Sequence, residues 1–373
     1  MRSLLKKTGE WLLALAISLV GIEIVLHVAV MAGVADIDLP SYSLKQAEPF
    51  WQDVNPDFGA WHVTNGRFRH RRSCFDLVYT SNAFGMRQGP TTLTSRSQRV
   101  VVLGDSFVEG WGVDAADRFT DRLAARTGIE HLNFGVAGDF GPTQAFVLYR
   151  ALAARFDHDA VILTVLPEND FLDDLPAPWR LQRGARHRPF LIGTYPDYRL
   201  AYPEGGWSAD KHAAWHVKNV LREFWLTYRV GDHAVAVMQQ TLAFWRKRGE
   251  FDLTHSFYFD YTPEDFGRLR YAIEQIKAAA GERPVLIVTI PVEMDYQRAK
   301  AAGTTPPLTR ELDAVAAELG ITYIDLLARM NDPQRARYFL QCDPHWSAFG
   351  HEQAASVISA WSYYRQQTAR QPQ

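Results

Sequence analysis

The hydrophobic residues of this chain follow two patterns. Residues 11–35 are almost uniformly apolar, with Glu23 and His27 as the only ionisable positions. From residue 99 onward, short β-branched runs alternate with longer stretches in which apolar residues recur at helical spacing. The first pattern is typical of a membrane-spanning helix, and the second indicates a globular domain of strands and helices.

The apolar segment is long enough to cross a bilayer, because 25 residues at 1.5 Å each exceed a hydrocarbon thickness of about 30 Å. Basic residues precede it and acidic residues follow it, namely Arg2, Lys6 and Lys7 before and Asp36 and Asp38 after. By the positive-inside rule, this distribution predicts a cytoplasmic N-terminus and an extracytoplasmic remainder. We therefore expect residues 1–35 to form a cytoplasmic stub and a single-pass anchor in the inner membrane, with the rest of the chain in the periplasm.

A cleaved signal peptide is the competing interpretation, since Ala32 and Ala35 are small residues of the kind found at cleavage sites. The apolar stretch exceeds the ~7 to 15 residues of a signal-peptide core, and this length favours an uncleaved anchor. Glu23 and His27 share one face of the helix, because they lie four residues apart. They are expected either to bond each other or a partner helix, or to be tolerated through helix tilt and local water.

Five apolar runs predict buried strands at residues 99–103, 131–134, 160–166, 285–290 and 321–326. Helical patterns lie between most of them and after the last, at residues 117–127, 142–156, 263–280, 308–319 and 347–364. Strands that are apolar on both faces and alternate with helices indicate a parallel sheet covered by helices on both sides. We therefore expect residues 99–368 to form a three-layer α/β/α domain.

Two segments do not follow this alternation. Residues 36–98 are rich in aromatic residues, proline and arginine, and we interpret them as a lead-in of loops and short strands. Residues 171–261 form an aromatic-rich insertion between the third and fourth strands, which we expect to be helical. Within it, residues 217–228 have apolar residues on one helical face and basic residues elsewhere. This amphipathic helix is expected either to dock on its own domain or to face a membrane or an acyl chain.

Charge and cysteine content exclude several kinds of site. The 373 residues include 40 basic and 42 acidic ones, so a formal net charge of -2 leaves no basic field for nucleic acid. We recognise no metal-ligand spacing and no cofactor motif, and expect neither a metal ion nor a cofactor. Cys74 and Cys342 are the only cysteines. They are interpreted either as one disulfide between the lead-in and the segment around residue 343, or as two free buried thiols.

Polar and glycine-containing motifs follow the first three predicted strands and precede the last helix. They are Gly-Asp-Ser at 104–106, Asn-Phe-Gly-Val-Ala-Gly at 133–138, Pro-Glu-Asn-Asp at 167–170 and Asp-Pro-His at 343–345. Each residue type alone is common in turns and helix caps. Their joint order is informative, because the carboxyl ends of parallel strands form the usual site crevice of such a sheet.

In these four motifs the sequence resembles the SGNH hydrolase superfamily, also called GDSL esterases, and its membrane-anchored bacterial branch. The resemblance covers about residues 80–170 and 262–360. It implies a flavodoxin-like sheet and acyl-ester chemistry without a cofactor. Two positions depart from the family pattern: Pro167 stands where the third motif usually begins with glycine, and Asp343 and His345 are two residues apart instead of three.

The resemblance implies a role for each of five residues. Ser106 is the expected nucleophile, and a serine hydroxyl needs a base to take its proton during attack. His345 is the expected base, with Asp343 holding its imidazole in the required tautomer. The backbone N–H groups of Ser106 and Gly138 and the side-chain amide of Asn169 are the expected oxyanion hole, which stabilises the negative charge on the acyl oxygen.

Two neighbouring residues are expected to have structural roles. Asp105 is expected to bond the turn beside the nucleophile. His351 is a second conceivable base, but its position one helical turn into the last helix favours packing.

Together these features predict an extracytoplasmic, membrane-anchored serine esterase that forms an acyl-enzyme. Acetyl esters of cell-envelope carbohydrate are the expected substrates. The alternatives are a carbohydrate O-acyltransferase with the same site, a lipid-directed esterase or lysophospholipase, and a non-catalytic carbohydrate-binding module. Envelope proteins are conceivable partners, but the sequence names none.

Overall fold

A five-stranded parallel sheet forms the centre of the protein. The computed structural model describes residues 2–34, 37–44, 50–138, 140–183, 185–206, 213–247, 255–330 and 335–368. The five strands are β5 (Arg99–Gly104), β6 (Glu130–Gly135), β7 (Ala160–Val165), β10 (Val285–Thr289) and β11 (Thr322–Asp325). Their order in the sheet is β11-β10-β7-β5-β6, with every neighbouring pair parallel. This is the flavodoxin-like order 2-1-3-4-5 read from the other edge, which confirms the predicted fold class.

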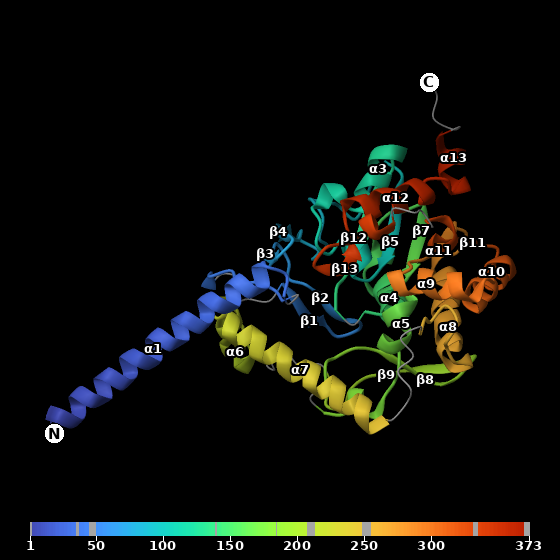
Figure 1. Cartoon of the computed structure of the whole chain (residues 1–373). Helices are drawn as coiled ribbons and strands as arrows, with labels where there is room; N and C mark the ends of the chain where they lie inside the picture. Colours follow the sequence, from blue (N-terminus) through green and yellow to red (C-terminus); the bar gives the residue numbers. More distant parts are fainter. Residues whose placement is uncertain are drawn as a thin grey trace.

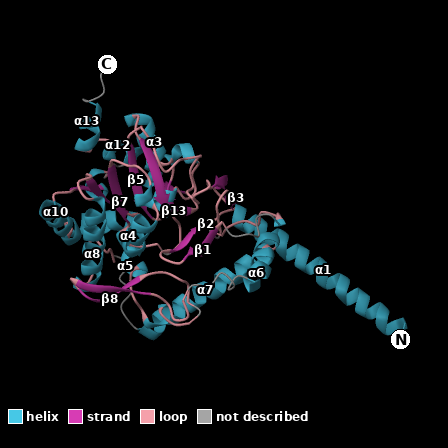
Figure 2. Cartoon of the chain, turned by 180° about the vertical axis from the view of Figure 1, so that it is seen from behind, coloured by secondary structure: helices cyan, strands magenta, loops and turns pink. Residues whose placement is uncertain are grey.

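Helices cover both faces of the sheet (Figures 1 and 2). Alternate strand residues point to opposite sides, so Val101 and Leu103 belong to one hydrophobic core and Val100 and Val102 to the other. The first core is covered by α4 (Pro142–Ala151), α8 (Pro263–Ala280), α9 (Glu293–Ala302) and α10 (Pro307–Leu319). The second is covered by α3 (Phe119–Thr127), α11 (Leu326–Arg329), α12 (Ala348–Ile358) and α13 (Ser362–Thr368). The layers are therefore those that the two-sided apolar strands predict.

The last predicted helix is two helices in the structure. The pattern predicts one helix over 347–364, whereas α12 ends at Ile358 and α13 begins at Ser362. Trp361 lies between them, is buried in the second core, and donates a hydrogen bond from its indole to Oγ1 of Thr322 (3.1 Å). The chain turns inward at this residue so that the indole is buried. A helical period alone does not indicate such a turn.

The lead-in consists of two hairpins that pack beside the main sheet. One is β1 (Trp51–Asn55) with β2 (Gly59–His62), and the other is β3 (Arg67–Arg72) with β4 (Phe75–Thr80). Cys74, in the turn between β3 and β4, forms a disulfide with Cys342. Cys342 lies in the turn between the short paired strands β12 (Phe339–Leu340) and β13 (Asp343–Trp346). Of the two interpretations of the cysteines, the structure has the disulfide.

Helix α1 (Arg2–Met31) projects from the globular part (Figure 1). Its segment Lys7–Met31 is long and apolar enough to cross a membrane by length and composition. Residues 35 and 36, where the predicted anchor meets the lead-in, lie outside the described residues.

The insertion is only partly helical. After α5 (Pro167–Asp173), the hairpin of β8 (Phe190–Thr194) and β9 (Asp197–Ala201) precedes α6 (Ala213–Phe224) and α7 (Leu226–Lys247). The insertion therefore contains the expected helices together with one hairpin that the sequence analysis does not predict. The single helix predicted over 217–228 is broken at Trp225, where the chain turns from α6 into α7.

Candidate active site

Ser106 lies at the carboxyl end of the central strand. It is the first residue of the short helix α2 (Ser106–Glu109), which follows β5 after one residue, Asp105. Oδ1 of Asp105 accepts a hydrogen bond from the N–H of Phe107 (3.0 Å) and so caps α2. Asp105 thus has the turn-bonding contact that the sequence analysis expects.

The structure brings Ser106 together with the distant Asp-Pro-His motif. The Ser106 hydroxyl is 2.7 Å from Nε2 of His345, within hydrogen-bond distance. The opposite ring nitrogen of His345, Nδ1, is hydrogen-bonded to Oδ1 of Asp343. The same carboxylate oxygen accepts the backbone N–H of His345 (2.9 Å). The carboxylate therefore turns back over its own backbone, and a separation of two residues allows the Asp–His contact.

Asp343 is held by groups from outside its own motif. Its Oδ2 accepts hydrogen bonds from the guanidinium of Arg72 in β3 and from the indole of Trp111 (3.1 Å). Burial alone raises the pKa of Asp343, but hydrogen bonding and charge from His345 and the charge of Arg72 outweigh it and lower that pKa overall. The carboxylate consequently stays ionised beside the imidazole.

Aromatic rings flank the imidazole of His345. The Trp111 ring is stacked on it at 5.4 Å between centroids, and the Phe107 ring lies 4.9 Å away. These contacts restrict the ring orientation, while the imidazole keeps its two hydrogen bonds to Ser106 and Asp343.

His351 is not placed to act as a base. Its side chain is buried, and its Nδ1 accepts a hydrogen bond from the backbone N–H of Phe119 (3.3 Å). Burial lowers the pKa of His351 well below its ordinary value, so the ring stays neutral in the core. The structure thus shows the packing role expected for it.

Gly138 and Asn169 follow the two strands that flank β5. Gly138 comes after β6 and has a φ of +94°, a left-handed conformation that favours glycine. Asn169 is in the first turn of α5, directly after β7. Because β6, β5 and β7 are adjacent and parallel, these residues and Ser106 come to the same edge of the sheet. Oδ1 of Asn169 is buried with no hydrogen-bond partner among the described residues, so this oxygen does not cap its own turn.

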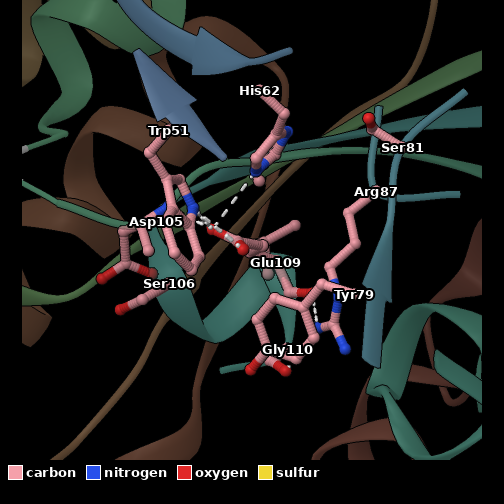
Figure 3. Close-up of polar contacts among 12 residues, drawn as sticks. Trp51, His62, Tyr79, Ser81, Arg87, Asp105, Ser106, Glu109 and Gly110 are labelled. Atoms are coloured by element: carbon pink, nitrogen blue, oxygen red, sulfur yellow. Dashed lines mark hydrogen bonds and ion pairs between the residues drawn. The ribbon is translucent and has the colours of Figure 1, made fainter. Parts of the chain in front are cut away.

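Glu109 of helix α2 contacts Trp51 and His62 of the lead-in (Figure 3), and it also bonds the turn that leads to Gly138. It lies one helical turn after Ser106, and its fully buried carboxylate accepts hydrogen bonds from the backbone N–H of Ala137 and from the indole of Trp51 (3.0 Å). Nε2 of His62 lies 3.5 Å from the same carboxylate. Burial raises the pKa of Glu109, but the nearby charges and hydrogen bonds lower it overall. The ionised carboxylate thereby fixes the peptide next to Gly138.

Arg87 supports the other end of the same short helix. Its guanidinium donates to the backbone carbonyls of Glu109 (2.7 Å), Gly110 (2.5 Å) and Val113 (2.7 Å). The last carbonyls of a helix lack partners within the helix, so a buried cation is a suitable cap for them. The lead-in therefore supports both α2 and the Asp343 loop.

Sequence reasoning did not find these supporting residues. Arg72 and Glu109 carry no motif, and their partners are far away in sequence or are backbone atoms. The usable signal for Arg72 was its position two residues before Cys74, since Cys342 adjoins Asp343. Choosing the disulfide over two free thiols would have placed the β3–β4 hairpin beside the Asp-Pro-His motif.

Two further features border the site. Arg186, from the insertion, donates a hydrogen bond to the carbonyl of Gly138 (3.1 Å). A groove of about 530 Å³ adjoins the Asp-Pro-His loop and is lined by Glu293, Ala336, Phe339, Leu340, Gln341, Asp343 and Pro344. Among the described residues, no cluster of three or more His, Cys, Asp or Glu side chains is arranged to hold a metal ion.

The chain is similar to known proteins in structure and not in sequence. No family model and no curated protein sequence matches the chain. Similar solved structures include a member of the lipolytic protein G-D-S-L family from Veillonella parvula (12% identity, 71% of this chain and 99% of that one, TM-score 0.38). The lipase/acylhydrolase from Enterococcus faecalis has 13% identity over 74% of this chain and 98% of that one, with a TM-score of 0.38. A carbohydrate esterase family 2 enzyme with a carbohydrate-binding domain from Corynascus thermopiles has 12% identity over 81% and 76%, with a TM-score of 0.39.

Proposed function

We propose that the chain is a serine esterase of the SGNH type, anchored by α1 in the cytoplasmic membrane, with its α/β domain outside the cytoplasm. The observation that carries this proposal is the continuous hydrogen-bonded series from the Ser106 hydroxyl through His345 to Asp343. A serine in contact with an imidazole that is itself oriented by a carboxylate is the arrangement that activates a hydroxyl for acyl transfer.

The reaction proceeds through an acyl-enzyme. Oγ of Ser106 attacks the ester carbonyl carbon while Nε2 of His345 takes the hydroxyl proton. The C–O bond to the alcohol then breaks, and the alcohol leaves with that proton. Water repeats the sequence in the second half: it loses a proton to His345, attacks the acyl carbon and releases the carboxylic acid, and the proton returns to Ser106. Asp343 stabilises the imidazolium that forms in both halves.

Charge that develops on the carbonyl oxygen requires donors at the opposite side of the site. We assign this role to the backbone N–H groups of Ser106 and Gly138 and to the side-chain amide of Asn169, which the three adjacent strands place at one edge. Removal of one donor of this kind typically lowers the rate by ~10² to 10³. Glu109 supports the hole by fixing Ala137, the residue before Gly138.

Acetyl esters of envelope carbohydrate are the proposed substrates. The groove beside the Asp343 loop contains Glu293 and Gln341, whose side chains can hydrogen-bond sugar hydroxyls. The lipid-directed alternative was based on the aromatic insertion. Helix α7 of that insertion, however, contacts both α6 and the membrane helix α1. The disulfide Cys74–Cys342 supports the extracytoplasmic location, because disulfides persist in oxidising compartments.

Labelling with a fluorophosphonate probe tests the proposed chemistry. We expect covalent modification of Ser106, identified by the mass of the labelled peptide, and loss of labelling in Ser106→Ala and His345→Ala. His351→Asn is the matched control, because it removes a histidine that packs in the core, and it should still be labelled. Labelling that survives in Ser106→Ala would overturn the assignment.

A substrate panel tests the proposed specificity. Turnover of acetylated sugar esters is expected to exceed turnover of long-chain acyl esters. A strong preference for long chains would replace the carbohydrate proposal by the lipid one. Transfer of the acetyl group to an added sugar in place of water would make the chain an O-acyltransferase with the same site.

A further inference from the structure

The carboxylate of Glu23 in the apolar helix α1 caps the N-terminus of α7. Its Oε1 accepts the backbone N–H of Leu226 (2.6 Å), and its Oε2 accepts the N–H of Thr227 (3.0 Å) and the Thr227 hydroxyl. Leu226 is the first residue of α7, so these are N–H groups that lack partners within the helix. An acidic side chain inside an apolar span is costly unless it is paired. The insertion supplies that pairing, and Glu23 therefore fixes α7 to the side of α1.

A small hydrophobic cluster reinforces this contact. Leu226 at the start of α7 is buried together with Val30 of α1 and with Leu39 of the following segment. Leu26 and Val230 pack against them. Apolar and polar contacts thus join α1 and α7 over the last turns of α1.

Charged residues of α6 and α7 pair with each other at the turn between the helices. Asp232 of α7 lies 3.3 Å from Nζ of Lys218 and is also bonded by Arg222, both in α6. Arg229 pairs with Glu223 and lies 3.7 Å from Asp38. The charged residues near the turn therefore all have partners of opposite charge.

Apolar side chains occupy the exposed surface of the same two helices. Val217 and Trp225 are 65% and 58% exposed, and Val235 and Met238 of α7 are 47% and 55% exposed. Among the described side chains of α7, the exposed positions other than His233 follow one helical stripe that has no charged residue. This stripe comprises Thr227, Gly231, Ala234, Val235 and Met238. A helix on the surface of a water-soluble protein usually turns its charged residues to solvent and its apolar residues to the core. Here the charged residues pair with each other and apolar residues are exposed.

We infer that the turn between α6 and α7, with the apolar stripe of α7, is inserted in the outer leaflet of the membrane beside α1. Glu23 lies eight residues before Met31, or about 12 Å along the helix axis, so the α7 N-terminus reaches below the end of the span. In Figures 1 and 2, α7 leaves the side of α1 and runs across its direction beneath β8 and β9. A helix in this position lies along the membrane surface with its apolar stripe in the acyl region.

This arrangement gives the membrane two contacts with the chain: a span, and a helix that lies along the interface. The exposed indole of Trp225 is suited to the membrane interface, because its ring is apolar and its N–H can stay hydrated. A single span would leave the α/β domain free to rotate about the axis of α1. The second contact prevents this rotation, so the two contacts together hold the domain in one orientation over the bilayer.

The inference rests on the anchor in the proposed function, and spin labelling separates the two. Both cysteines of the sequence are in the disulfide, so an introduced cysteine is the only free thiol. We would attach a nitroxide to Trp225→Cys and Met238→Cys in the full chain, reconstituted in vesicles of phosphatidylethanolamine and phosphatidylglycerol. Val20→Cys in α1 reports the anchor, and Ser356→Cys, exposed on α12, is the aqueous control. Collision rates with oxygen, which partitions into lipid, and with a water-soluble nickel chelate then give the environment of each label.

Labels at 225 and 238 are expected to be accessible to oxygen and protected from the nickel chelate, with an oxygen-to-nickel ratio several-fold above that at 356. A ratio equal to that at 356 overturns the inference. Protection from both reagents means that the stripe is covered by protein, for example a second copy, and also overturns it. If the label at 20 is itself in water, the anchor fails, and the inference fails with it. Fluorophosphonate labelling of the same samples reports separately on the proposed esterase site.

Discussion

The guanidinium of Arg72 donates a hydrogen bond to Oδ2 of Asp343, on the opposite side of the carboxylate from His345. Arg72 belongs to the lead-in hairpin, and the two residues are 271 positions apart. The contact holds the carboxylate and, together with His345, lowers its pKa, so we propose that Arg72 is a positioning residue that acts through Asp343. The proposed active site is thus completed by a part of the chain that the family resemblance does not cover.

Replacing Arg72 by Ala is expected to lower kcat about tenfold, equivalent to about 1.4 kcal/mol, with little change in KM. Without the guanidinium the pKa of Asp343 rises, so protonation of the carboxylate at acidic pH removes the support for His345. The acidic limb of the pH–rate profile should therefore move to higher pH. Steady-state kinetics over a pH series measure both effects. Arg69→Ala on the same strand, where Arg69 pairs with Asp76, is the control and should change neither.

Glu109→Ala is expected to lower kcat about tenfold or more, because Ala137 loses the acceptor that fixes the peptide next to Gly138. KM should change less than kcat, since the oxyanion donors act mainly in the transition state. Glu130→Ala removes a carboxylate that pairs with Arg99 away from the site, and it serves as the matched control. Equal kcat in the two variants would show that Glu109 has no positioning role.

Asp105 should make the fold less stable as the pH rises. Burial raises the pKa of Asp105 to about 6, above the value of an unfolded aspartate, so the folded state binds a proton more tightly. Stability is therefore lost between about pH 4 and about pH 6, by roughly 3 kcal/mol at most. Asp105→Asn keeps the Oδ1 acceptor and stays neutral. Thermal unfolding should show this variant to be more stable than the parent at neutral pH and equal to it near pH 4; a variant that is less stable at neutral pH would contradict the sign.

Removal of the disulfide should affect both stability and rate. The bond closes a loop of 268 residues, and loss of such a constraint typically costs about 4 kcal/mol. In the double variant Cys74→Ser and Cys342→Ser, the Asp343 loop also loses its covalent link to the Arg72 hairpin, so kcat should fall. Thermal unfolding and kinetics measure the two effects. Unchanged kcat together with a lower Tm would limit the bond to a structural role.

Much of the α/β domain could be predicted from the sequence, because each central strand is apolar on both faces and each following helix has its own period. Helix α8 is the clearest case: its predicted bounds, 263–280, are those observed, since Thr262 and Asp265 form a capping box and Pro263 begins the first turn. Local signals of this kind are complete within a few residues.

Contacts between distant segments could not be predicted in the same way. Nothing near Arg72 indicates that its partner is Asp343, and nothing near Glu109 indicates a bond to the backbone of Ala137. Similarly, the helical period over 217–228 does not reveal the break at Trp225, directly after which Glu23 of α1 caps α7. These features follow from tertiary packing, for which one sequence provides no pattern.

The wide separation of the site residues has a consequence during biosynthesis. A growing polypeptide that has already exposed Ser106 still lacks His345, Asp343 and Cys342, which emerge only with the final tenth of the chain. Nascent and prematurely terminated products therefore lack the base and the carboxylate of the proposed site. On the proposed topology, the complete set of proposed site residues is present only after the last part of the chain has been synthesised and translocated.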